Sequence, residues 1–185
     1  MSCILWRRER GLGLERCVIE PISDGWRLAG TVLLVTDDVP TEIRYSIQTD
    51  LAWNTRTAGA HVQSPLGDRR MALKADGSGA WFSNDQPIID LYGAQDVDMA
   101  WTPATNMLPI RRLDLAEGEE AAVAAAWLGF PDHTVTRLEQ RYQRLDARTY
   151  RYTAGELSVD LTVDELGRVL RYPGGWEAVA ETSGR

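Results

Sequence analysis

Hydrophobic and polar residues alternate with a period of two along much of the chain. Between residues 42 and 50, Ile43, Tyr45 and Ile47 fall on one face of an extended segment, and the residues between them are polar. The same period recurs over residues 156–164, where aliphatic side chains alternate with acidic and hydroxyl side chains. This alternation is typical of a strand with one buried face, which antiparallel sheets commonly contain. We therefore expect antiparallel sheet in both places.

Short extended segments separated by glycine, proline and aspartate continue the pattern over the rest of the chain. We expect further strands at residues 3–7, 15–21, 26–35, 55–64, 69–75, 80–82, 97–101, 110–115, 135–145, 148–153 and 168–172. The sequences Asp76-Gly77-Ser78-Gly79 and Asp164-Glu165-Leu166-Gly167 have the composition of tight turns. Each should join its two flanking strands into a hairpin. The pattern as a whole predicts an all-β fold.

Two segments favour helix by their residue types. Residues 119–127 are rich in alanine and glutamate, which have high helix propensity. At Thr102-Pro103, a threonine that can cap a helix precedes a proline that fits the first turn. Because Pro109 should prevent continuation beyond Leu108, we expect a single helical turn at residues 103–107.

Length and composition are those of one domain. The chain has 185 residues, of which 44% are hydrophobic, and it contains no repeat, linker or shift in composition. We therefore expect a single domain over residues 1–185, with residues 181–185 frayed. The net charge of -7 disfavours nucleic acid and anionic membranes as general partners, although local basic patches can still bind anions.

The cysteines and the first residues predict a soluble cytoplasmic protein. Cys3 and Cys17 are too few for a disulfide framework and are not spaced like zinc ligands, so we expect reduced, partly buried thiols. The first residues turn charged after three apolar residues, unlike a secretory signal or a membrane-spanning helix. We expect no integral association with a membrane.

No motif for nucleophilic catalysis, metal binding or a cofactor is present in the sequence. His61 and His133 are the only histidines, and neither lies in a triad or metal motif. Gly77-Ser78-Gly79 is a turn and not a nucleophile elbow. We expect no catalytic residues, no metal and no cofactor.

A polar group is expected around Asp96 and Asp98, which lie two residues apart and should face the same side of a strand. Arg111 and Arg112 should face opposite sides, so that one of them can pair with the acids. The group can be a buried Asp–Arg network that orders the end of the sheet, or a polar rim that binds sugar hydroxyls or a phosphate. A metal site is the weakest of these alternatives, because two aspartates alone rarely hold a cation.

Tryptophan is unusually frequent, with seven residues, and such large rings need either a large core or a cavity to line. We expect five of them near a cavity, most of them as core residues and two or three in contact with a ligand. These are Trp53, Trp81, Trp101, Trp127 and Trp176.

One long stretch of sequence resembles a known family. Residues 96–113 read Asp-Val-Asp-Met-Ala-Trp-Thr-Pro-Ala-Thr-Asn-Met-Leu-Pro-Ile-Arg-Arg-Leu. This run resembles the core motif of a bacterial glycolipid-binding family that was formerly a domain of unknown function. Supporting matches are the Tyr45…Asp50…Trp53 pattern, Gln140-Arg141-Tyr142, and Val163-Asp164…Gly167…Tyr172-Pro173-Gly174. The matches span nearly the whole chain.

The resemblance implies a strongly curved antiparallel sheet or half-open barrel, similar to periplasmic lipoprotein carriers, with one or two short helical turns. It also implies a strand at residues 121–130 in place of the helix that alanine favours. The alanines there would widen a pocket on whichever face they line. The implied function is non-catalytic binding of a glycolipid or another lipid-like ligand, such as a fatty-acyl chain, in the concave face.

On this hypothesis, apolar side chains take the acyl chain and polar groups at the rim take the head group. The expected ligand-binding residues are Trp53, Trp81, Asp96, Asp98, Trp101, Asn106, Arg111 and Tyr142. Two alternatives stay open: a hydrolase or isomerase that uses Asp96 or Asp98 as general base, and an interaction module with a filled core. We expect the protein to be a monomer or a homodimer.

Overall fold

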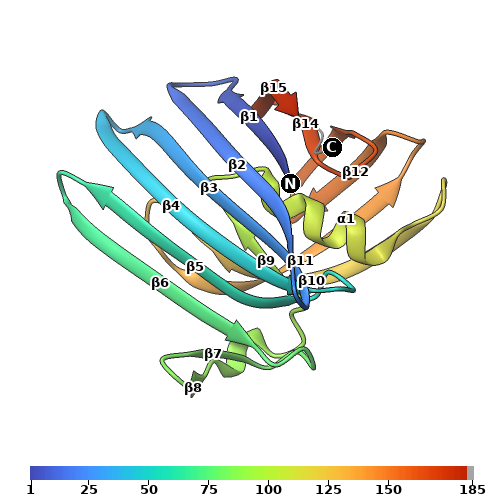
Figure 1. Cartoon of the computed structure of the whole chain (residues 1–185), viewed down its shortest axis with the longest axis horizontal. Coiled ribbons are helices and arrows are strands. Elements are labelled where there is room, and N and C mark those ends of the chain that lie inside the picture. Colours follow the sequence, from blue (N-terminus) through green and yellow to red (C-terminus); the bar gives the residue numbers. More distant parts are fainter. Residues whose placement is uncertain (183–185) are drawn as a thin grey trace.

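The computed structural model describes residues 1–182 of the chain, which form one strongly curved sheet of 15 strands (Figure 1). The strands are β1 (Ser2–Arg8), β2 (Gly13–Ile22), β3 (Gly25–Thr36), β4 (Val39–Asp50), β5 (Thr55–Ser64), β6 (Gly67–Ala75), β7 (Trp81–Ser83), β8 (Gln86–Pro87), β9 (Asp96–Met99), β10 (Glu120–Leu128), β11 (Val135–Arg144), β12 (Thr149–Ala154), β13 (Leu157–Val163), β14 (Val169–Tyr172) and β15 (Trp176–Thr182). The helical elements are η1 (Ile89–Leu91), η2 (Ala104–Asn106) and α1 (Met107–Leu113). The expected all-β class and curved sheet are confirmed.

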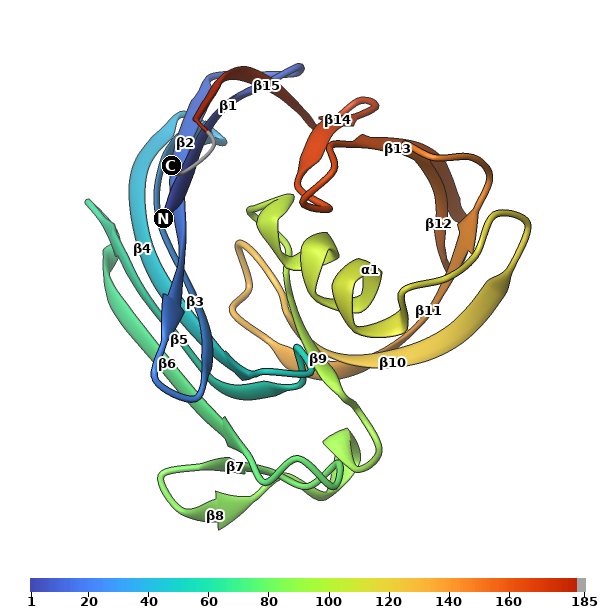
Figure 2. The ribbon, with the colours of Figure 1, turned by 45° about the vertical axis from the view of Figure 1, so that its right-hand side comes forward.

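The strand order explains how the sheet becomes a half-open barrel. Strands β8 to β1 follow one another across the sheet, β1 then pairs with β15, and β15 to β9 complete the order. All paired strands are antiparallel except β9 and β10, which are parallel. The two edge strands of the described sheet, β8 and β9, are therefore neighbours in the chain. Figure 2 shows the sheet curling round α1, which lies on its inner side.

The alternation in sequence becomes an inner and an outer face. In β4, Ile43, Tyr45 and Ile47 are buried, whereas Arg44 and Ser46 between them are exposed. The turns at residues 76–79 and 164–167 join β6 to β7 and β13 to β14, as expected. Two strands were not expected, β8 and β15. Glu181 and Thr182 were expected to fray, but they pair with β1, and residues 183–185 lie outside the described part.

The segment after β9, which contains η2 and α1, packs on the inner side of the curved sheet, and we call it the plug. Ala104, Met107 and Leu108 are buried in the main core. The helical turn expected at residues 103–107 is present as η2, Ala104–Asn106. The helical segment does not end there, and the strand expected at 110–115 is wrong, because α1 continues from Met107 to Leu113. Pro109 does not end this helix because it lies in the first turn, where a backbone N–H has no helical acceptor in any case.

Strand β10 confirms the resemblance and corrects the expectation of a helix from alanine content. Each of its residues has a register partner on β11, and four also pair with β9. These contacts override the helix propensity of alanine. Ala124 and Ala126 lie with Leu128 in the main core, which also contains the inner faces of β4 and β5. The small side chains thus serve close packing and do not line the cavities described below.

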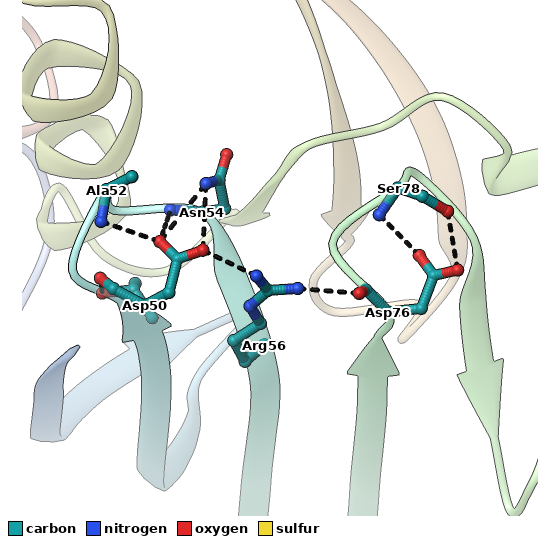
Figure 3. A network of polar contacts seen from close by, with 7 residues as sticks. Asp50, Ala52, Asn54, Arg56, Asp76 and Ser78 are labelled. Carbon is teal, nitrogen blue, oxygen red and sulfur yellow. Dashed lines mark hydrogen bonds and ion pairs between the residues drawn. The ribbon is translucent and has the colours of Figure 1, made fainter. Parts of the chain in front are cut away.

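A polar network fixes the turn between β4 and β5 (Figure 3). The carboxylate of Asp50 accepts hydrogen bonds from the backbone of Ala52 and Asn54 and from Arg56. Arg56 also donates to the carbonyl of Asp76, which links this turn to the turn before β7. The turn holds Trp53 at a φ of 67°, with its ring stacked on Trp26 at 5.0 Å. Asp50 and Trp53 of the Tyr…Asp…Trp pattern therefore have a structural role in this turn, whereas Tyr45 lies within β4.

Candidate functional site

A cavity of about 420 Å³ remains on the inner side of the sheet, between the plug and strands β12 to β15. This volume is within the range of small-molecule sites. Its lining is Arg8, Asp98, Met99, Ala100, Thr102, Pro103, Asn106, Trp127, Leu138, Tyr152, Ala154, Leu157, Tyr172, Gly175 and Trp176. We call it the inner cavity. Leu157 is 43% exposed, so the cavity reaches the surface at the turn between β12 and β13.

Four aromatic rings give the inner cavity its apolar walls. Trp127 comes from β10 and Tyr152 from β12, while Tyr172 and Trp176 are register partners on β14 and β15. The rings of Tyr152 and Tyr172 lie 6.3 Å apart in a tilted arrangement. Aromatic faces of this kind accept both the apolar face of a sugar ring and alkyl groups.

Asp98 is the acidic group of the inner cavity. It lies opposite Trp127 in the register of β9 and β10. Its carboxylate accepts hydrogen bonds from Thr105 at 2.9 Å and from Gln140 at 2.6 Å. Burial raises the pKa of Asp98, and these hydrogen bonds offset part of the increase. Asp98 is thus held in a fixed orientation by two uncharged donors.

Two further polar side chains of the lining, Asn106 and Arg8, are held by contacts with neighbouring aromatic residues. Asn106 donates to the hydroxyl of Tyr142 at 2.8 Å. The guanidinium of Arg8 lies 5.9 Å from the ring centre of Trp176, in a cation–π arrangement. The cavity therefore combines a carboxyl, an amide and a guanidinium with aromatic walls.

A buried acid lies directly behind the wall of the inner cavity. Glu15 is fully buried, and its Oε1 accepts hydrogen bonds from Tyr45 and, at 2.6 Å, from Thr102. Its Oε2 has no hydrogen-bond partner in the described residues. Burial raises the pKa of Glu15 to about 8, although the bonds from Thr102 and Tyr45 lower it. Glu15 was not among the residues expected from the sequence. The residue lies at a core-facing position of β2, but its side chain is not apolar, so the alternation of apolar and polar residues does not mark it as buried.

Of the eight residues expected to bind ligand, Asp98 and Asn106 line the inner cavity. Asp96 forms a buried ion pair with Arg112, with an oxygen–nitrogen distance of 2.6 Å. Arg111 instead lies over the ring of Trp53, 5.3 Å from its centre. Asp96 thus belongs to a buried Asp–Arg network, which is the structural alternative for this acid, and its partner is Arg112.

The other expected aromatic residues are in the core. Trp81 donates to the carbonyl of Ala94 at 2.8 Å, and Trp101 packs edge-on against Phe130. Tyr142 is 1% exposed and does not line the inner cavity, but it contacts two lining residues, Asn106 through a hydrogen bond and Tyr152 through rings 5.1 Å apart. Trp127 and Trp176, which belong to the wider set of tryptophans expected near a cavity, are the two that line it.

Arg8, Tyr152 and Tyr172 were not expected at a site. The motif Tyr172-Pro173-Gly174 marks one of them, but only the register between strands brings it beside Trp176.

The described part of the chain lacks a metal cluster and a membrane-spanning helix, and it has a second hollow on its surface. Residues 1–182 contain no cluster of three or more His, Cys, Asp or Glu side chains arranged to hold a metal ion. No helix in that range has the length and apolar character needed to cross a bilayer. A hollow of about 880 Å³, larger than the inner cavity, is a groove on the outer face of the sheet, which we call the outer groove.

Comparison with known proteins gives two matches and one negative result. The sequence model of the family described as "Putative glycolipid-binding" matches residues 3–178. A crystal structure of a DUF1089 family protein from Pseudomonas aeruginosa is similar with a TM-score of 0.80 and 32% sequence identity, over 91% of this chain and 92% of that one. No curated protein matches the sequence.

Proposed function

The chain belongs to the glycolipid-binding family, and from this premise we propose that its inner cavity binds the head group and adjoining methylenes of a glycolipid. The observation that carries the proposal is the composition of the cavity lining. Trp127, Tyr152 and Trp176 supply apolar surface, and Asp98 and Asn106 supply fixed polar atoms among them. A sugar with an alkyl chain has both kinds of surface.

The plug limits how much of a lipid the protein takes up. Because η2 and α1 pack on the inner side of the sheet, the ligand occupies only the space on the β12–β15 side. Each buried methylene of the ligand contributes about 0.8 kcal/mol. The hydrogen bonds that already fix Asp98 and Asn106 reduce the entropy lost when a head group binds.

The experiment is a calorimetric titration of the delipidated full chain with monomeric octyl glucoside as probe. We expect saturable binding, and weaker binding of glucose, which lacks the chain. Trp127→Leu should weaken binding roughly tenfold, which corresponds to about 1.4 kcal/mol. The matched control is Trp26→Leu, because Trp26 stacks on Trp53 away from the inner cavity. Equal affinities of the two variants, or no saturable binding by the parent chain, would contradict the proposal.

A second candidate function rests on the position of Asp98. A buried carboxyl with a raised pKa beside a cavity is a candidate general base for a hydrolase or an isomerase. Asp98→Asn keeps the shape of the side chain and removes its basicity. Turnover of an amphipathic ester that survives this substitution would exclude Asp98 as the base.

A further inference from the structure

The outer groove is lined by residues of β1 to β6 at the strand ends nearest the turn between β1 and β2. Figure 1 shows these six strands side by side. Its floor is a continuous row of register partners, in which Arg7 lies beside Leu14, Leu14 beside Leu33, and Leu33 beside Glu42. The adjacent residues Leu34 and Thr41 are buried, so the row faces away from the core.

The middle of this row is an exposed apolar patch. Leu12, Leu14 and Leu33 are 73%, 50% and 53% exposed. Single exposed leucines are ordinary on protein surfaces, but these three line the same groove. A contiguous apolar patch next to polar residues marks a surface that contacts a protein, a ligand or a membrane.

The next row of the outer face is basic. It runs across five strands in register and consists of Arg16, Thr31, Arg44, His61 and Arg70. The carboxylates of the two rows and of the neighbouring strand already have partners: Glu42 forms an ion pair with Arg44 and Glu177 with Arg7, and Asp68 makes a hydrogen bond with His61. Within residues 1–182, Arg16 and Arg70 form no ion pair. Two exposed guanidinium groups are therefore left without a countercharge.

We propose that this face docks on the surface of an anionic lipid bilayer, with Leu12, Leu14 and Leu33 in the interface and Arg16 and Arg70 against the head groups. Exposed leucines beside free arginines suit the boundary between acyl chains and anionic phosphates. A second copy of the chain is a poorer occupant, because it would bring further unneutralised arginines to a face that already has them. The net charge of -7 favours an orientation in which only this face approaches the bilayer.

The docking face borders the inner cavity. Arg8 lines both the outer groove and the inner cavity. The backbone of Glu9, in the turn after β1, donates to the carbonyl of Gly175, which also lines the inner cavity. Docking thus brings the rim of the inner cavity to the bilayer. The leucines and arginines of the docking surface do not line the inner cavity, so this surface does not depend on what the cavity binds.

The test is co-sedimentation of the full chain with phosphatidylcholine vesicles that contain or lack phosphatidylglycerol. We expect binding to the anionic vesicles, weakened by added salt. Arg16→Gln with Arg70→Gln should reduce this binding roughly tenfold or more, as should Leu14→Ser with Leu33→Ser. Arg141→Gln with Arg151→Gln is the matched control, since it removes the same charge from arginines that pair with Glu120 and Asp160.

Equal loss of vesicle binding in the control variant, or equal binding to neutral and anionic vesicles, would overturn the proposal. Dimerisation without lipid that the Leu14→Ser and Leu33→Ser double variant abolishes would also overturn it, in favour of a second copy. Titration with octyl glucoside separates this surface from the inner cavity, because the Arg16→Gln, Arg70→Gln variant should bind that probe as the parent does.

Discussion

At the scale of single residues, Glu15 is the most unusual group in the molecule. It is a fully buried carboxyl that accepts hydrogen bonds from two hydroxyls and forms no ion pair within residues 1–182. Burying an unpaired carboxylate is costly, so the folded state favours the protonated form. The proton of Glu15 thereby links folding to pH.

Glu15 should make the protein less stable as the pH rises. Its pKa is raised from 4.5 to about 8, so between these values the folded chain holds a proton that the unfolded chain releases. The free energy of unfolding should therefore fall by about 1.4 kcal/mol per pH unit through this window, and be unaffected by this group below it.

Denaturant unfolding of Glu15→Gln at several pH values measures this contribution. The variant should lack this part of the decline, so its stability relative to the parent should improve from pH 5 to pH 8. Glu156→Gln, at an exposed position, is the control and should follow the parent. Parallel stability curves for the parent and Glu15→Gln would show that Glu15 is not protonated in the fold.

At the scale of elements, the plug determines what space is left on the inner side of the sheet. Its helix is tied to the edge of the sheet by the ion pair of Arg112 with Asp96, whose side chains are 11% and 1% exposed. Removing one partner from a buried pair leaves the other charge without compensation. The attachment of α1 should therefore depend strongly on this pair.

Arg112→Ala should destabilise the protein by about 3–5 kcal/mol, because it leaves the carboxylate of Asp96 buried alone. Arg151→Ala removes an exposed pair with Asp160 and should cost less than about 1 kcal/mol. Thermal or denaturant unfolding of both variants measures the difference. Similar small losses in the two variants would mean that the Arg112–Asp96 pair does not hold the plug.

The elements also show which structural features can be predicted from sequence. Strands such as β4 and β5 follow from alternation, because one face of each is buried while the other is largely exposed in β4 and half-buried in β5. Helix α1 could not be predicted in this way, because the position of Pro109 in the first turn is visible only once the start of the helix is known. For β10, local propensity favours helix, and only its partners β9 and β11 make it a strand.

The candidate site was less predictable than the strands for a related reason. The parity of Asp96 and Asp98 is local, but whether each meets the plug or the cavity depends on contacts with Arg112, Thr105 and Gln140. Likewise, the register that places Tyr172 beside Trp176 is a property of the sheet and not of either strand.

At the scale of the whole molecule, the curvature of the sheet creates two surfaces with different chemistry. The inner cavity is aromatic with fixed polar groups, and the outer groove is lined by leucines with arginines beside it. Arg8 lies at the boundary of the two. A protein that takes a glycolipid from a bilayer needs both surfaces, and each can be altered without the other.

The most direct test of the central claim is to follow the indole N–H signals of the seven tryptophans by NMR while monomeric octyl glucoside is added. The indoles of Trp127 and Trp176 line the inner cavity, so their signals should shift together and saturate. Those of Trp6 and Trp81, which donate to the carbonyls of Val169 and Ala94 in the core, should stay in place. Saturable binding that leaves Trp127 and Trp176 unshifted would place the ligand elsewhere and contradict the account.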